Sequence, residues 1–556
     1  MKQKVGWLAL VSLMSLAVLA ACGNNKEKAS NSRKTEDVSQ VINITSEAQI
    51  STMDPALAAD TTSTLAMNQV YEGLYVLGKD DEFVLGVAKE EPTVSDDLTT
   101  YTFKLREDSK WSDGSQVTAA DFVYGWQQIV TPAVGSPNAD VIVGVIKNAK
   151  EIYEDGADPK TLGVKAIDET TLEVQLERPV PYLKSLLTFA IFYPKKEAFI
   201  EEQGKEFATS SENLLYNGPF VMEGWEAFAD EWTYKPNAEY WDKETVKLES
   251  ATVQVIKTPS TAVNLFESEE VDVVNKLTSE YAKNYKENES FLPVEQYVTF
   301  FLKLNAERSG KETPLANKDL RQAIAQSFDK EAFVTNILGD GSTATDNLIP
   351  KGQTKEPKSG DDFTDVAKKT NTYLTYNPEA AKKSLELAKK ELGDKIELEF
   401  LTDDTEVAKT SAEFFSNQIE TNLSGVKINI VQVPFTVRVE RDQKKDYDIE
   451  LSGWGTDYRD PLTVMRIFVS NNSSGGITYS SPTYDQLIND SREKDAGNVD
   501  KRFDNFIQAE NELINKDTVI APIYNRSLAI LANQSIKDMY WHPFGSTYSL
   551  KWAYVE

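Results

Sequence analysis

The most regular pattern of apolar and polar positions lies between residues 377 and 457. Asn377 and Pro378 supply a helix cap and a first-turn proline, and Gly393 stands just beyond the end of the helix that they open. The apolar periods that follow alternate between two kinds, which predicts strands at 396–401, 427–433 and 447–452 and helices at 406–422 and 436–444. This alternation is typical of βαβ units, so we expect a parallel sheet and an α/β fold.

The loop after the third of these strands is a candidate ligand site because of its position. It reads Gly-Trp-Gly-Thr-Asp-Tyr and spans residues 453–458. In open parallel sheets, ligands bind in the crevice beyond the carboxyl ends of the strands. We therefore expect this loop to border a binding site.

Shorter patterns predict the elements of the N-terminal half. Thr118 and Asp121 form a capping-box-like start for a helix that Pro132 ends. A helical apolar period also runs over residues 64–77. Alternating positions and turn signals predict strands at 42–44, 101–105, 171–176 and 298–304, and a hairpin of strands at 220–225 and 231–234.

The first 22 residues have the pattern of an export signal. Two lysines precede an apolar run, which is too short to span a membrane, and the sequence Leu-Ala-Ala-Cys follows it. This sequence resembles the bacterial lipobox, in which the cysteine thiol receives a diacylglycerol. We interpret residues 1–21 as a lipoprotein signal peptide, Cys22 as the lipidation site and residues 22–40 as a flexible tether. The alternative is a plain secretory signal with a chance cysteine, which we favour less because the chain has no other cysteine.

Composition limits the chemistry that the chain can perform. Its 556 residues exceed what one core usually supports, so we expect two or three domains. The net charge of −29 would repel nucleic acid, and we attribute it to solubility, with attraction for cationic ligands as the weaker alternative. His542 is the only histidine, so a usual zinc site cannot be built and a histidine-activated nucleophile would need this one residue. We expect no enzyme, no cofactor and no metal; a carboxylate-based hydrolase is the enzymatic alternative.

Four collinear segments resemble the oligopeptide-binding lipoproteins of ABC peptide importers, which are extracytoplasmic solute-binding proteins. The similarity covers nearly the whole chain after the signal. The segments are 101–126 with Lys110-Trp-Ser-Asp-Gly114, 217–241 with Asn217-Gly-Pro-Phe220, 320–330 with Leu320-Arg-Gln-Ala-Ile324, and 447–461 with Gly453-Trp454 and Asp457-Tyr458.

The resemblance implies an α/β fold of three domains, in which two lobes close over the ligand like a hinged clamp. An extended oligopeptide lies between the lobes and pairs its main chain with strand edges. The implied partners are extracellular oligopeptides and the membrane subunits of an ABC permease, and the implied receptor is a monomer anchored by its lipid at the outer face of the cell membrane. A specialised peptide-pheromone receptor on the same fold is the alternative. The implied domains are lobe I at 41–72, 190–285 and 515–556, an additional domain II at 73–189, and lobe III at 286–514.

The resemblance also implies a set of peptide-binding residues. Asp457 matches the family aspartate that pairs with the α-ammonium of the peptide, and a charge of this kind is needed because an enclosed ammonium cannot be left unpaired. A turn or capping role for Asp457 is the alternative, but we assign the cap of the next helix to Asp460. The stretch Gly453, Trp454 and Gly455 matches the strand edge that bonds the peptide backbone, and a core role for the tryptophan is compatible with this. The edge from the other lobe falls at Ala48, Gln49 and Ile50.

The chain departs from the family pattern where the peptide carboxylate is held. Members that prefer short peptides carry an arginine two residues before the Gly-Trp pair and a histidine after the strand at 396–401. These positions fall at Leu451 and near Val407 or Ala408 in this chain. None of these side chains can pair with a carboxylate, so we expect longer peptides to be accepted.

Overall fold

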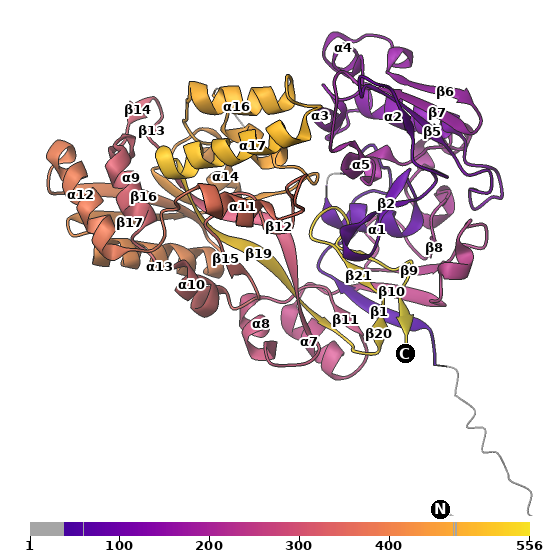
Figure 1. The fold of residues 1–556 in the computed structure, drawn as a ribbon. Coiled ribbons are helices and arrows are strands. Elements are labelled where there is room, and N and C mark those ends of the chain that lie inside the picture. The colour runs from indigo at the N-terminus through magenta and orange to yellow at the C-terminus, as the bar shows by residue number, and fades with distance from the viewer. Residues whose placement is uncertain (1–37, 59, 471, 473–474) are drawn as a thin grey trace, which may run out of the picture. The chain divides into compact units, whose positions relative to one another are not determined.

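The structure is a computed structural model that describes residues 38–556 except 59, 471, 473 and 474 (Figure 1). The predicted signal peptide, Cys22 and the tether up to residue 37 lie outside the described residues. Residues 39–556 form one compact unit by their internal contacts. Within the described part, no helix is long and apolar enough to cross a membrane.

A mixed sheet of eleven strands organises this unit (Figure 1), and the predicted α/β fold is confirmed. The short strand β15 (Thr343–Ala344) pairs with β19 beside the main path. The order along the path is β17 (Val426–Val433), β16 (Ile396–Asp403), β18 (Ile449–Gly455), β12 (Phe291–Leu304), β19 (Ile520–Ala532), β11 (Val273–Val274), β1 (Val41–Ser46), β10 (Ser250–Val255), β9 (Glu231–Pro236) and β8 (Phe220–Glu223).

The predicted βαβ units are confirmed at one end of the sheet. Strands β16 and β17 run parallel over their full length, and α13 (Glu406–Asn422) connects them. The helix forms here because its Phe415 and Ile419 recur on one face and are buried in the core between helix and sheet. Helix α14 (Phe435–Gln443) then leads to β18, which also pairs parallel to β16. The sheet as a whole is mixed, since β18 runs antiparallel to β12.

Local capping signals were read correctly from the sequence. The side chain of Asn377 accepts a hydrogen bond from the Ala380 amide at the start of α12 (Pro378–Leu392), and Gly393 follows with a left-handed φ of 81°. The capping box of Thr118 and Asp121 opens α2 (Ala119–Val130). These signals succeed because each depends on residues only a few positions apart.

A second sheet lies wholly within the predicted domain II. It is antiparallel and has the order β4 (Thr93–Val94), β5 (Thr100–Lys104), β7 (Thr171–Gln175) and β6 (Val164–Asp168). The predicted strands at 101–105 and 171–176 are its two central strands. The predicted hairpin at 220–234 is formed by β8 and β9. The exact domain boundaries remain predictions.

Two predicted elements are wrong at their ends. The helix expected over 64–77 is α1 (Thr61–Val70), and the segment continues into β2 (Tyr75–Leu77), which pairs with β3 (Phe83–Leu85). Both segments are largely buried, so their apolar positions could not mark where the helical period ends. The expected loop at 453–458 begins too early, because β18 continues to Gly455, opposite Val298 of the long strand β12.

The pair β12–β19 joins the two halves of the large sheet and contains an irregularity. The register shifts between Glu295 and Thr299, so the ladder is interrupted there. Tyr297 leaves the ladder: its amide donates to Pro543 O at 2.9 Å, and its carbonyl accepts from the Thr456 amide at 2.8 Å. The backbone beside Asp457 is thereby bonded to the point where the two long strands separate.

Candidate functional site

Trp454 and Asp457 line a common cavity of about 500 Å³ at the carboxyl end of β18. One wall comes from 137–145 and Arg178 in the predicted domain II. The other comes from residues between 454 and 469, from Asn472 and from α16 (Pro482–Arg492) in the predicted lobe III. The walls are joined by the stacked rings of Tyr182 and Tyr458, whose centroids are 4.4 Å apart. The helices α3 (Ala139–Ile142) and α16 can be found near each other at the top of Figure 1.

Asp457 has only loose partners for its charge. Its Oδ2 accepts from Thr463 Oγ1 at 3.2 Å and lies 3.4 Å from Arg466 Nη2. The carboxylate side chain is 45 % exposed, but it opens into the cavity rather than onto a flat surface. Desolvation by the cavity walls raises the pKa of Asp457, and the Arg466 guanidinium lowers it by a smaller amount. A second cation would therefore be bound favourably here.

The neighbouring Asp460 has a structural role at the start of the next helix. Its Oδ1 accepts at 2.9 Å from the amide of Leu462, which is the first residue of α15 (Leu462–Met465), whereas the N-cap position expected at Asp460 falls one residue later, at Pro461. Both carboxylate oxygens also bond Arg502, with Nη2 2.7 Å from Oδ1, and both side chains are buried. This bidentate pair holds the loop rigidly. The Asp460 carboxylate is thus occupied by the Leu462 amide and Arg502, whereas Asp457 faces the cavity.

The stretch Gly453 to Gly455 forms one paired and one open strand edge. On the paired side, Gly453 lies opposite Phe300, and a Cβ on this glycine would stand 2.8 Å from the phenyl ring. On the other side, β16 pairs only with Ile449 and Glu450, so among the described residues no strand covers positions 451–455. The Trp454 Nε1 is buried and has no hydrogen-bond partner in the described part of the chain. The open edge offers main-chain groups to a ligand.

The second predicted edge is not at the same cavity. Ala48, Gln49 and Ile50 follow β1 and are absent from the lining of the Asp457 cavity. The Gln49 amide donates to Phe228 O at 2.7 Å and to Asp230 Oδ1 at 2.8 Å, and Ile50 is buried in the core. A ligand role for these three residues remains a prediction.

The positions expected from the family resemblance to meet a peptide carboxylate have apolar side chains here. Leu451 packs against the core and lies opposite Leu302 of β12, and Val407 is exposed at the start of α13. Nearby Arg438 is itself paired with the buried Glu450. The expectation of longer peptides remains a prediction.

Sequence reasoning missed the arginines of the cavity. Arg178, Arg466 and Arg492 all line it, together with Asp140. Arg178 and Asp140 come from the wall across the cavity from Asp457, more than 270 residues earlier in the chain. No local pattern could have brought these residues together, because tertiary packing alone does so. Only Arg466, nine residues after Asp457, is close enough in the sequence for a local pattern to have predicted that it lies near Asp457.

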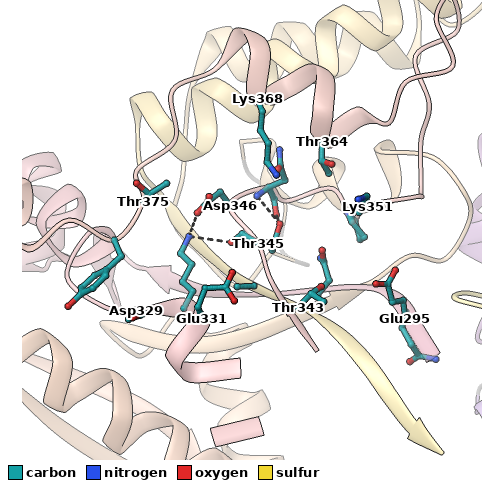
Figure 2. A pocket seen from close by; sticks show the side chains of 17 residues that line it. Glu295, Asp329, Glu331, Thr343, Thr345, Asp346, Lys351, Thr364, Lys368 and Thr375 are labelled. Atoms are coloured by element: carbon teal, nitrogen blue, oxygen red, sulfur yellow. Dashed lines mark hydrogen bonds and ion pairs between the residues drawn. The ribbon is translucent and has the colours of Figure 1, made fainter. Parts of the chain in front are cut away.

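A second, larger cavity of about 600 Å³ lies beside β12, β15 and β19 (Figure 2). Lys330 enters it from α10 (Lys330–Phe333), and its Nζ is 2.7 Å from Asp346 Oδ1. Burial lowers the pKa of Lys330, and the adjacent Asp346 raises it by a smaller amount. Lys351 and Lys368 are exposed at its border. The sequence did not predict this cavity.

Similarity to known proteins identifies the family of this chain. The family model of the bacterial extracellular solute-binding proteins, family 5 (Middle), matches residues 82–476. The chain therefore belongs to the family 5 extracellular solute-binding proteins of bacteria. A dipeptide-binding protein of Lactococcus lactis subsp. cremoris is 30 % identical over 567 residues, which cover 100 % of both chains.

Two solved structures are similar over nearly the whole length. Listeria monocytogenes OppA bound to peptide has 39 % identity and a TM-score of 0.74, covering 93 % of this chain and 99 % of that one. The pheromone receptor PrgZ has 34 % identity and the same TM-score, covering 93 % and 100 %. The predicted family is confirmed.

Proposed function

We propose that this protein is an extracytoplasmic receptor that binds oligopeptides in an extended conformation and delivers them to an ABC transporter permease. The observation that carries this proposal is Asp457: a carboxylate in a cavity, with loose partners, directly after an open strand edge. The peptide-binding relatives with matching full-length folds support it.

The geometry suits a peptide better than other small solutes. The α-ammonium would bind Asp457, where a charge pair offsets the cost of enclosing the cation. The peptide main chain would pair with the open edge at 451–455, and these backbone bonds would contribute affinity that does not depend on the side chains of the peptide. Trp454 Nε1 would gain an acceptor that none of the described residues provides. The peptide is returned unchanged, since binding requires no bond to be broken.

A specialised receptor for a signalling peptide is the second candidate. The similarity to the pheromone receptor PrgZ favours it, and Leu451 and Val407 leave the end of a long apolar peptide unclamped. Both candidates use the same groove and differ in how many peptides are accepted.

The place of action follows from the N-terminal pattern. We assign the protein to the outer face of the cell membrane as a monomer, anchored by a lipid on Cys22. Cys22→Ser should move the protein from the membrane fraction to the medium and abolish incorporation of labelled palmitate. Retention of the variant in membranes with the label would contradict this assignment.

The experiment that tests the function uses the soluble chain without residues 1–22. Native mass spectrometry gives the mass of bound material, and release followed by peptide sequencing identifies it. A ladder of peptides supports the general receptor, and one dominant peptide supports the signalling receptor. Hydrolysed peptides, or no binding from an added library, would contradict both.

A further inference from the structure

The cavity around Asp457 differs in charge from the rest of the molecule. The chain as a whole carries a net charge of −29. Three arginines but only two aspartates, Asp140 and Asp457, line the cavity. Solubility accounts for an excess of acidic residues over the whole surface. It does not account for an excess of arginine over aspartate around one cavity, so this positive lining needs a local explanation.

The arginines of the lining are poorly neutralised by the protein itself. Arg178 bonds two backbone carbonyls, Arg492 O at 2.9 Å and Gly144 O, and has no carboxylate partner among the described residues. Arg492 approaches Glu493 at 3.4 Å, with both side chains about half exposed. Ion pairs with this geometry contribute little. The guanidinium groups therefore keep most of their capacity to bind an anion.

Arg466 is the most informative of the three. Its Nη2 is 3.4 Å from Asp457, and its Nε is buried without a hydrogen-bond partner in the described part of the chain. Asp457 is also its only carboxylate partner there. When a peptide ammonium takes Asp457, Arg466 shares that partner with a second cation. An anion supplied by the same ligand would restore the balance.

We propose that this cavity selects peptides that carry an aspartate or glutamate within their first two residues. The inference rests on the proposed function, since it assumes that the peptide ammonium lies at Asp457. The acidic side chain then meets Arg466, together with Arg178 from the opposite wall or Arg492 at the end of α16. A guanidinium binds a carboxylate through two parallel hydrogen bonds, which a lysine cannot reproduce. A basic side chain at the same place would face three like charges and is excluded.

The test compares peptides that differ only in charge. Two pairs of heptapeptides carry glutamate or glutamine at the first or the second position, and isothermal titration calorimetry gives their affinities for the soluble chain. We expect the glutamate peptide to bind at least fivefold more tightly in one of the pairs at low salt, with the ratio falling as salt is added. Equal binding in both pairs, or tighter binding of glutamine, would overturn the inference and leave the proposed function intact. Failure of all four peptides to bind would count against the proposed function instead.

Variants locate the preference. Arg466→Gln should bring the glutamate-to-glutamine ratio, measured with both peptides on the same variant, close to one. Lys351→Gln, a change of the same kind at the border of the other cavity, should leave the ratio as it is. A ratio that survives both Arg466→Gln and Arg492→Gln, in proteins whose melting temperatures match the parent, would show that the arginines do not select the ligand.

Discussion

Two cavities of this molecule differ in how their charged side chains are paired. In the larger one, Lys330 is held 2.7 Å from Asp346, and its side chain is only 9 % exposed. In the smaller one, Arg466 and Asp457 are 3.4 Å apart, and both side chains are 40–45 % exposed. The charges of the first pair are satisfied by each other. In the second pair, the carboxylate can still bind a cation and the guanidinium can still bind an anion.

This difference indicates which cavity binds a ligand. The larger volume belongs to the cavity whose buried charges already have partners, so a ligand would gain little from them. The smaller cavity combines a loosely paired carboxylate, under-neutralised arginines and an open strand edge. Unsatisfied charge is thus a better guide to function here than volume.

The largest effect should come from breaking the complete pair. Asp346→Ala leaves Lys330 as an uncompensated buried charge and should lower the free energy of unfolding by about 3–5 kcal/mol, measured by urea denaturation. Replacing both residues, as Lys330→Met with Asp346→Leu, should recover most of this loss. A double variant no more stable than Asp346→Ala would show that the pair does not act as a unit.

At Asp457 we expect a loss of peptide affinity rather than a loss of stability. Asp457→Asn keeps the shape of the side chain but removes the charge that holds the peptide ammonium. Peptide affinity should fall by about 2 kcal/mol or more, which is at least 30-fold, with an unchanged melting temperature. Calorimetry with one heptapeptide measures the first quantity. An unchanged affinity would place the ammonium elsewhere.

The close packing on the paired side of the strand edge can be tested at Gly453. Gly453→Ala puts a methyl group against the ring of Phe300, whose own face is stacked on Tyr524 with centroids 4.7 Å apart. The ring has little room to move, so we expect a loss of about 1–3 kcal/mol in stability. Gly455→Ala is the matched control, because its Cβ would meet only Val298 at 3.5 Å. Similar losses for both variants would argue against the clash.

The pH dependence of peptide binding should follow the protonation of Asp457. Peptide ammonium binds the ionised carboxylate, so affinity is constant above the pKa of Asp457 in the free protein and decreases below it. Because the cavity walls raise this pKa, the decrease should begin at a higher pH than for an ordinary aspartate, whose pKa is about 3.9. Titrations between pH 7 and 4 measure it. Asp457→Asn should have a flat profile, and an equally steep profile in that variant would assign the proton to another group.

The smallest effect concerns peptide length. Without a charged clamp at Leu451, a heptapeptide should bind severalfold more tightly than a tripeptide, because it forms more backbone bonds along the edge. Leu451→Arg should narrow this difference by giving the short peptide a partner for its carboxylate. Tighter binding of tripeptides by the unmodified chain would contradict the expectation.

Features whose residues lie close together in the sequence could be predicted, and features that depend on distant residues could not. The cap at Asn377, the capping box at Thr118 and the βαβ units were predicted because their signals are a few residues apart. The end of α1 was missed, since the buried segment after Val70 gives no period. Arg178 joined the cavity only through packing of distant segments, and no sequence window contains both it and Asp457.

The interruption at Tyr297 has a mechanical meaning. A continuous ladder resists bending, but the register shift between Glu295 and Thr299 removes that stiffness along one line between the halves of the sheet. We expect the sheet to bend most easily at this line. The Tyr297 carbonyl accepts a hydrogen bond from the Thr456 amide, one residue before Asp457. A ligand anchored at this loop is therefore connected to the interruption both through the β12–β18 ladder and through the Thr456–Tyr297 hydrogen bond that extends it.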